Sequence, residues 1–201
     1  MNDKFFDLKK GKQDAMINAA LKVFAQYGYR FASTDEMVKE AHISKGLLFH
    51  YFGSKLGLYT FVYDYAVRYV SMEISSVIAP SDHDFFELCR KYEAAKLSIC
   101  RTYPYMFLFL HKAQDEDIEE AELAITDRRT ELQALYQQTL QQSDLSSFHS
   151  EEEAIMTERI VRVTLNELMD TQLQEHSFEP ELMYDEGIHY INFLEKAITA
   201  G

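Results

Sequence analysis

Two short amphipathic segments separated by a tight turn lie in residues 33–52, which read STDEMVKEAHISKGLLFHYF. Thr34 precedes two acidic residues and is the expected N-cap of a short helix, because carboxylates stabilise the positive end of the helix dipole. Ser44 follows Ala41 by only three residues and is a second N-cap candidate, so another helix is expected from Lys45. Two short helices joined in this way form a helix-turn-helix.

The second of these helices has one face suited to packing and another suited to contact. Leu48 and Phe52 are four residues apart and are expected to anchor the helix on its neighbours. The opposite face carries a cation, an apolar side chain and two hydrogen-bonding rings, namely Lys45, Leu47, His50 and Tyr51. This mixture suits the base edges of a DNA major groove, although simple surface exposure is the alternative for His50 and Tyr51. Phosphates are expected at the helix starts, near Thr34, Ser44 and Lys55.

Apolar residues at helical spacing predict a helix before this pair and a long helix after it. The first is indicated by Met16, Ala19, Ala20, Val23, Phe24 and Tyr27, with Gly28 where a C-terminal cap belongs. The second, over about 55–78, carries the stripe Leu58, Phe61, Val62, Tyr65, Tyr69 and Met72. Further helices are expected near 83–101, 104–114, 117–142, 151–175 and 181–199. The predicted fold class is therefore all-α, with the helix over 55–78 as a connector.

Composition and charge agree with a helical protein that has one basic end. The 201 residues are 47% hydrophobic with only 7 Gly and 3 Pro, which leaves little room for long loops or many strands. The net charge is −13, but residues 1–55 hold nine Lys and Arg against six Asp and Glu, a balance of +3, and the remainder carries −16. An N-terminal module able to approach phosphate is therefore expected on an acidic body.

The sequence lacks the patterns of common catalytic, metal and membrane-spanning segments. It contains no HExxH, no CxxC, no phosphate-binding Gly loop and no hydrolase Ser elbow, so we expect no enzymatic activity, no cofactor and no metal site. Cys89 and Cys100 are eleven residues apart, about 16 Å on one helix, which rules out a disulfide within it. Without a signal-peptide pattern or a long apolar run, a cytoplasmic location and no membrane partner are expected.

Over residues 14–59 the chain resembles the TetR/AcrR family of repressors. The matching residues are Ile17, Ala19, Ala20, Leu21, Val23, Phe24, Gly28, Ser33, Thr34, Met37, Val38, the run from Ala41 to Gly46, the run from Leu48 to Phe52, Ser54, Lys55 and Leu58. The resemblance implies a three-helix DNA-binding domain over 1–55, a fourth helix that connects, and a helical ligand-binding and dimerisation domain over 56–201. It also implies a palindromic double-stranded operator and a homodimer that spaces two reading heads by roughly 34–36 Å.

The candidate DNA-binding residues are Ser33, Thr34, Ser44, Lys45, Gly46, Leu47, Phe49, His50, Tyr51 and Lys55. Several depart from the family pattern. His42 stands where Gly is usual and, if positive φ is required, is among the few other residues enriched there. Phe49 replaces the more usual Tyr and could instead pack on the first helix. Leu56 and Gly57 replace an acidic pair, so the fourth helix is expected to start a little late.

The last two long helices each carry two apolar stripes, and one stripe is enough to face a helix's own core. The second stripes are expected to pair with a second copy of the chain across a two-fold axis. The alternative is that both are covered within one chain. The candidate dimer-interface residues are Met156, Ile160, Val163, Met183, Gly187, Tyr190, Ile191 and Leu194.

The middle of the chain is dense in aromatic residues, which predicts a cavity for a small hydrophobic or aromatic effector. Plain core packing is the alternative. The candidate ligand-binding residues are Phe61, Tyr65, Tyr92, Glu93, Tyr105, Met106, Phe109 and His111. The favoured function is a transcriptional repressor that such an effector releases from its operator. A DNA-binding protein whose body binds a protein partner is the second hypothesis, and an enzyme on a helical bundle is the least favoured.

Overall fold

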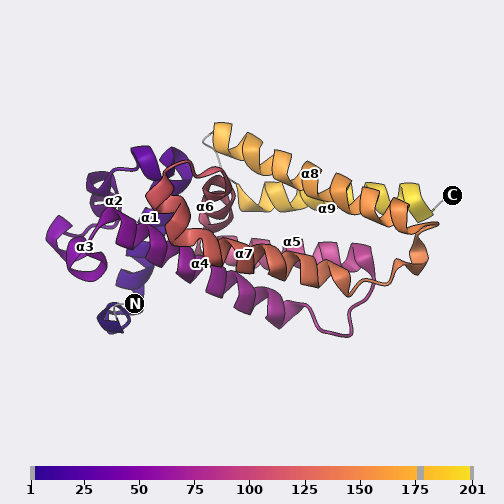
Figure 1. Cartoon of the computed structure of the whole chain (residues 1–201), viewed down its shortest axis with the longest axis horizontal. Helices are drawn as coiled ribbons and strands as arrows, with labels where there is room; N and C mark the ends of the chain where they lie inside the picture. Colours follow the sequence, from indigo (N-terminus) through magenta and orange to yellow (C-terminus); the bar gives the residue numbers. More distant parts are fainter. Residues whose placement is uncertain (1–2, 176–178, 200–201) are drawn as a thin grey trace. The chain divides into compact units, whose positions relative to one another are not determined.

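The computed structural model describes residues 3–175 and 179–199, which form helices and no β-strand (Figure 1). The predicted all-α fold class is therefore confirmed. The α-helices are α1 (Lys10–Phe31), α2 (Thr34–Glu40), α3 (Lys45–Phe52), α4 (Lys55–Val77), α5 (Phe85–Thr102), α6 (Met106–Lys112), α7 (Glu119–Gln141), α8 (Glu151–Glu175) and α9 (Pro180–Thr199). Short 3-10 turns lie at Asp3–Phe5, Ala113–Asp115 and Leu145–Ser147. Within the described residues, none of the helices combines the length and the apolar character needed to cross a membrane.

Packing divides the chain into two compact units, each built from two separate stretches. The head unit comprises the residues up to Tyr69 together with Thr102–Leu132. The body unit comprises Val70–Arg101 and the residues from Gln133 onward. α4 and α7 therefore each contribute to both units. The functional boundary expected near residue 55 stays a prediction, because it concerns DNA binding rather than packing.

The head unit is held by a core in which α1 packs against both α2 and α6. The Phe24 ring of α1 lies 4.9 Å from that of Tyr59 and 6.0 Å from that of Phe109, measured between centroids. Met37 of α2 and Leu48 of α3 are buried as well, which agrees with the anchoring role predicted for Leu48. The two short helices are therefore fastened to the head unit by their apolar faces.

Gly28 interrupts α1 close to its end. Its φ of 65° and ψ of 177° lie outside the helical region, and the chain then makes one more turn as far as Phe31. The predicted break at Gly28 is confirmed, although this residue does not end the element. A residue with a Cβ rarely adopts such a positive φ, which explains the glycine at this position.

His42 forms the turn between α2 and α3 with a φ of 52° and is the only non-glycine residue with positive φ among residues 3–175 and 179–199. Its N–H donates to the Lys39 carbonyl at 3.3 Å, and that of Ile43 donates to the Val38 carbonyl at 3.0 Å. The positive φ considered from the sequence is therefore confirmed. A left-handed conformation costs an L-residue about 1–2 kcal/mol, so the tight turn is made at some expense.

Replacing His42 by glycine is expected to stabilise the protein. The His42 side chain is exposed, so its removal costs little packing, while glycine adopts the observed φ without strain. We expect the free energy of unfolding to rise by about 1 kcal/mol and the Tm by roughly 2–4 °C. Thermal unfolding followed by circular dichroism measures this change. An unchanged or lower Tm would show that the side chain makes a compensating contact.

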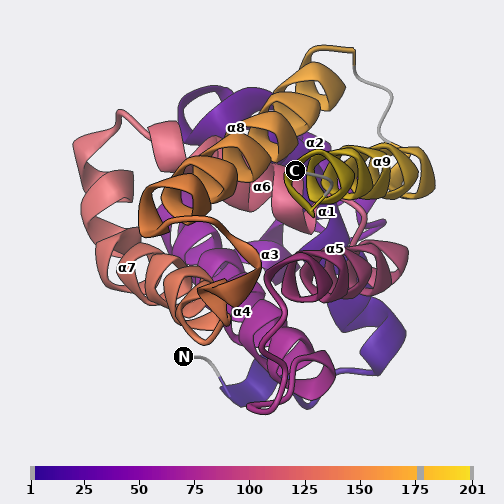
Figure 2. The ribbon, with the colours of Figure 1, turned by 90° about the vertical axis from the view of Figure 1, so that its right-hand side faces the viewer.

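The body unit is built around an apolar cluster contributed by α5, α8, α9 and the segment before α8. Its buried members are Phe85, Phe86, Cys89, Phe148, Ala154, Val161 and Ile191. α8 runs beside α9, as Figures 1 and 2 show. Cys89 and Cys100 are free, buried thiols on the single helix α5, and burial raises the pKa of each to about 12. The expectation that no disulfide joins them is confirmed.

Candidate nucleic-acid interface

α3 begins and ends where the sequence predicted. The N-cap Ser44 is in an extended conformation, and its hydroxyl oxygen accepts a hydrogen bond from the Leu47 N–H at 3.2 Å. Gly53 follows the last residue with a φ of 73°, and its N–H donates to the Phe49 carbonyl. These caps confine α3 to eight residues and make it a short, well-bounded rod.

The exposed face of α3 is centred on Gly46 and His50. Leu48 is only 2% exposed and points into the head unit, opposite these two residues on the helix. Leu47 and Phe49 flank the exposed face and are half-buried. Tyr51 is also half-buried, with its ring centroid 5.0 Å from that of His50. The anchoring role predicted for Leu48 is confirmed, while the contacts of the outer face with DNA stay a prediction.

The start of α2 differs by one residue from the expected one. Ser33 occupies the N-cap position, and Thr34 is the first helical residue. The Ser33 side chain makes no capping hydrogen bond, so its exposed hydroxyl is not used within the helix. Lys45 lies within reach of the same helix start, because its ammonium pairs with the Asp35 carboxylate at 2.8 Å. Both side chains of this pair are exposed, so the attraction is weak and open to competition.

Lys55 closes the end of α1 instead of pointing only to solvent. Its ammonium donates to the carbonyl oxygens of Tyr29 at 2.8 Å, Arg30 at 3.3 Å and Ala32 at 3.4 Å. It also lies 4.6 Å from the centroid of the Tyr29 ring. These carbonyls are among the acceptors that a helix end leaves unsatisfied. Lys55 therefore has a structural role that its position in the sequence did not reveal, and its phosphate contact stays a prediction.

α4 begins at Lys55, so the expectation of a late start is wrong. The Ser54 hydroxyl accepts a hydrogen bond from the Gly57 N–H at 3.0 Å and caps the first turn. Gly57 also lies against the end of α3, since a Cβ there would be 2.0 Å from the Phe52 carbonyl oxygen. Glycine at position 57 therefore allows the closely packed junction between α3 and α4.

The candidate ligand-binding residues belong to two different packing units, and their contacts with a ligand stay a prediction. Tyr92 and Glu93 belong to the body unit, while the head unit holds Phe61, Tyr65, Tyr105, Met106, Phe109 and His111. Met106 and Phe109 are at most 1% exposed, and the Phe109 ring packs against Phe24, Tyr59 and Tyr63. These two residues therefore belong to the core of the head unit, which agrees with the alternative of plain core packing given in the sequence analysis.

Glu93 forms an ion pair with a residue of the same helix. Its carboxylate pairs with the Lys96 ammonium at 2.9 Å, and both side chains are buried. A carboxylate that is already neutralised by an ammonium is less available to a ligand. Glu93 is therefore better explained as half of a buried ion pair than as a ligand contact.

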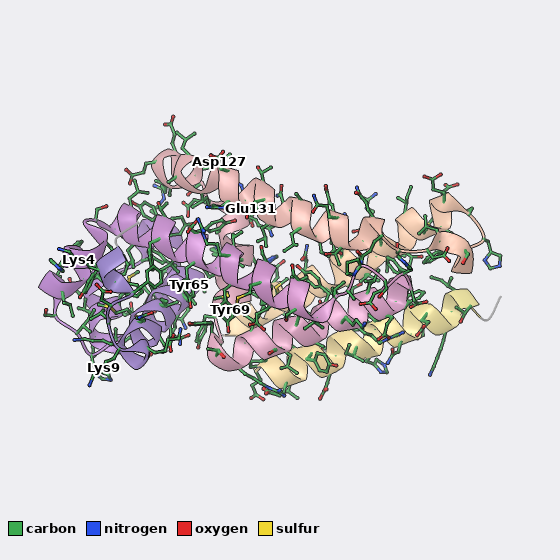
Figure 3. The ribbon with its side chains drawn as sticks, turned by 90° about the horizontal axis from the view of Figure 1, so that it is seen from below. Lys4, Lys9, Tyr65, Tyr69, Asp127 and Glu131 are labelled. Carbon is green, nitrogen blue, oxygen red and sulfur yellow. The ribbon has the colours of Figure 1, made fainter. Side chains whose placement is uncertain are left out.

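The head unit also contains a hydrogen-bond network that the sequence did not suggest. The Tyr103 hydroxyl donates to the Asp14 carboxylate at 2.7 Å and lies 2.6 Å from the Tyr65 hydroxyl. Lys10 binds the same carboxylate at 2.7 Å. Tyr69 stacks on Tyr65, as Figure 3 shows. Tyr103 is far in the chain from both Asp14 and Tyr65, so no local spacing could have indicated that it meets them.

Burial divides the candidate dimer-interface residues into two groups. On α8, Met156, Ile160 and Val163 are exposed, as expected for an unpaired stripe. On α9, Met183, Gly187 and Ile191 are buried within the body unit, and Leu194 packs against its core. Tyr190, the remaining candidate on α9, is exposed, and the role of these residues in a dimer interface stays a prediction. The exposed apolar residues of that helix are Leu182, Tyr190 and Phe193.

The described residues contain no group of three or more His, Cys, Asp or Glu side chains arranged to hold a metal ion. Comparison with known proteins finds similarity to bacterial regulators over part of the chain. The model for bacterial regulatory proteins of the tetR family matches residues 16–60, from α1 into the start of α4. The HTH-type transcriptional regulator YuxN of Bacillus subtilis is 45% identical over 59 residues, which are 27% of this chain and 20% of that protein. The chain thus matches a fifth of this relative's length.

Solved structures share the whole fold at low sequence identity. A TetR family transcriptional regulator from Chloroflexus aurantiacus has a TM-score of 0.66 and 18% identity, over 99% of this chain and 96% of that one. The fatty acid degradation regulator FadR from Bacillus halodurans has a TM-score of 0.62 and 17% identity, over 94% and 98%. The chain therefore shares its fold with these solved structures, and its residues 16–60 are similar to bacterial regulatory proteins of the tetR family.

Proposed function

We propose that the protein is a homodimeric transcriptional repressor that reads a palindromic operator with α3. The observation that supports this most strongly is the division of α3 into a buried anchor, Leu48, and an outward face centred on Gly46 and His50. A helix of this kind can enter a major groove while its other side stays fixed to the head. Ser33, Thr34 and Ser44 stand at helix starts, where hydroxyls and backbone N–H groups can hold phosphates.

Direct DNA binding tests the proposal. The purified protein is expected to retard a duplex recovered by selection and to bind it at least about 10³-fold more tightly than a random duplex at the same salt concentration. His50→Ala should lower that ratio, because a side chain in the groove carries sequence information. Equal affinity for all duplexes, or no binding at low salt, would contradict the reading role of α3.

A salt series separates the roles of Lys45 and Lys55. Lys45→Ala is expected to lower the slope of log affinity against log salt concentration by about one unit per head, because its exposed ammonium can exchange Asp35 for a phosphate. Lys55→Ala should change the slope less and lower the free energy of unfolding by about 1–3 kcal/mol, since three carbonyls lose their donor. Equal slope changes with unchanged stability would instead favour the phosphate contact first expected for Lys55.

The dimer is proposed to form through the outer apolar face, defined as Met156, Ile160 and Val163 of α8 with Leu182, Tyr190 and Phe193 of α9. All six residues are exposed in the single chain. Apolar residues at helical spacing on the outside of a helix need a cover, and a second copy provides one by symmetry. Such a dimer would present two copies of α3 to one operator.

Release by a small apolar effector completes the proposal. Tyr92 of the body unit is half-buried, so it can offer a ring and a hydroxyl to such a molecule. For a switch, the effector must prefer the chain in its DNA-free state, and a coupling of about 1–3 kcal/mol is typical. Titrating an effector found by thermal-shift screening with and without operator measures this coupling. Equal affinities in the two titrations would reject the effector and favour a protein partner for the body.

A further inference from the structure

The segment before α1 packs against the end of α3. Phe5, in the 3-10 turn Asp3–Phe5, is fully buried although it lies close to the start of the chain. Its ring centroid is 5.3 Å from that of Phe52, 5.8 Å from that of Tyr51 and 5.0 Å from that of Phe61. Tyr51 and Phe52 are the last two residues of α3, and Phe61 belongs to α4. Phe5 therefore fills the angle between these two helices.

This segment is held in place by hydrogen bonds as well as by its ring. The buried Gln13 side chain of α1 donates from Nε2 to the Phe6 carbonyl at 3.0 Å and to the Leu8 carbonyl at 2.7 Å. The Leu8 N–H donates to the Phe5 carbonyl at 3.2 Å. Because the Gln13 amide binds two carbonyls of the segment, it holds the backbone in a turn. The segment is thus an ordered part of the head unit.

α3 needs support at its C-terminal end. A helix of eight residues is unstable by itself, so its direction depends on what it packs against. Leu48 anchors its middle, and Ser44 caps its start. The last turn is supported by Phe5 through Tyr51 and Phe52.

We propose that Phe5 is a positioning residue for DNA reading, which holds the last turn of α3 at the angle that base contacts require. The inference rests on the proposed function. Base contacts depend on the direction of the helix, whereas phosphate contacts through flexible ammonium groups tolerate small rotations. Loss of Phe5 therefore lowers sequence-specific binding more than binding to random DNA.

Point substitutions test this better than truncation, because the segment also carries the exposed cations Lys4 and Lys9 (Figure 3). Phe5→Ala and the milder Phe5→Leu are compared with Phe6→Ala. Phe6 is the adjacent residue of the same type but is 44% exposed, so it is a matched control. Affinities for the selected operator and for a random duplex are measured at one salt concentration. Hydrogen exchange of the amides in 45–52 is measured without DNA.

Phe5→Ala is expected to weaken operator binding by about tenfold or more while random-duplex binding changes by less than about twofold. Exchange over 45–52 should accelerate, with α7 unchanged. Phe5→Leu should lie between, and Phe6→Ala should resemble the wild type. Unchanged operator affinity and exchange in a folded Phe5 variant would overturn the inference. An equal loss of affinity for the operator and for the random duplex in Phe5→Leu would also overturn the inference. Failure of the wild type to bind any duplex would instead reject the proposed function, while the exchange data would still show whether Phe5 supports α3.

Discussion

Lys96→Met is expected to lower the free energy of unfolding by about 3–5 kcal/mol, because it leaves the Glu93 carboxylate buried without its ammonium. The two groups are 2.9 Å apart, and their side chains are 5% and 4% exposed. Around them the body unit is tightly packed, since a Cβ on Gly187 would lie 3.1 Å from Leu165 and 3.9 Å from a Glu93 oxygen. Urea unfolding followed by circular dichroism measures the loss.

Two variants show whether this loss comes from the buried charge. Lys91→Met on the same helix breaks a pair with Asp82, whose side chains are 30% and 19% exposed, and should cost no more than about 1 kcal/mol. Glu93→Leu combined with Lys96→Met removes both charges and should recover most of the stability, because apolar groups of similar volume replace the pair. A double variant as unstable as Lys96→Met would show that packing, rather than the unpaired carboxylate, causes the loss.

Ile160→Glu combined with Phe193→Glu is expected to convert the dimer to monomers and to weaken operator binding by about 10²–10⁴-fold. These residues are 44% and 63% exposed in the single chain and belong to the proposed outer apolar face. Carboxylates there would be buried against apolar side chains of the second copy. A monomer binds one half-site and loses the gain that comes from linking two heads. Analytical ultracentrifugation and operator titration measure the two effects.

Ile155→Glu is the matched control for the dimer variant. Ile155 is on α8 and 61% exposed, but it projects from a different side of the helix than Ile160. We expect this variant to remain dimeric and to bind the operator as the wild type does. If the double variant also remained dimeric, the outer apolar face would not be the interface.

Local signals were sufficient to predict the head helices. The first and last residues of α3 were both predicted correctly from Ser44, the short spacing to α2 and the apolar pair Leu48 and Phe52. Such prediction is possible because a cap and a helical period involve only a few neighbouring positions. The same holds for Gly28 and His42, whose backbone conformations follow from the geometry of tight turns. Each of these features depends on neighbours along the chain.

Features that depend on distant contacts could not be predicted in this way. On α9 both stripes are apolar, so the sequence could not tell that Met183, Gly187 and Ile191 face the core while Phe193 faces outward. Lys55 is a cation at a helix start, and only the fold shows that the end of α1 lies within its reach. The contact between Phe5 and Phe52 likewise joins segments more than forty residues apart.

Selection of bound duplexes from a random pool, performed with the wild type and with His50→Ala, tests most directly whether α3 reads DNA twice per dimer. We expect an inverted repeat whose half-sites are centred about 10 base pairs apart, one turn of the duplex. His50→Ala should relax the preference at one symmetric position in each half-site, by about 1–3 kcal/mol for each lost contact. A sequence without two-fold symmetry, or the same preferences from both proteins, would contradict the proposal that α3 reads the operator.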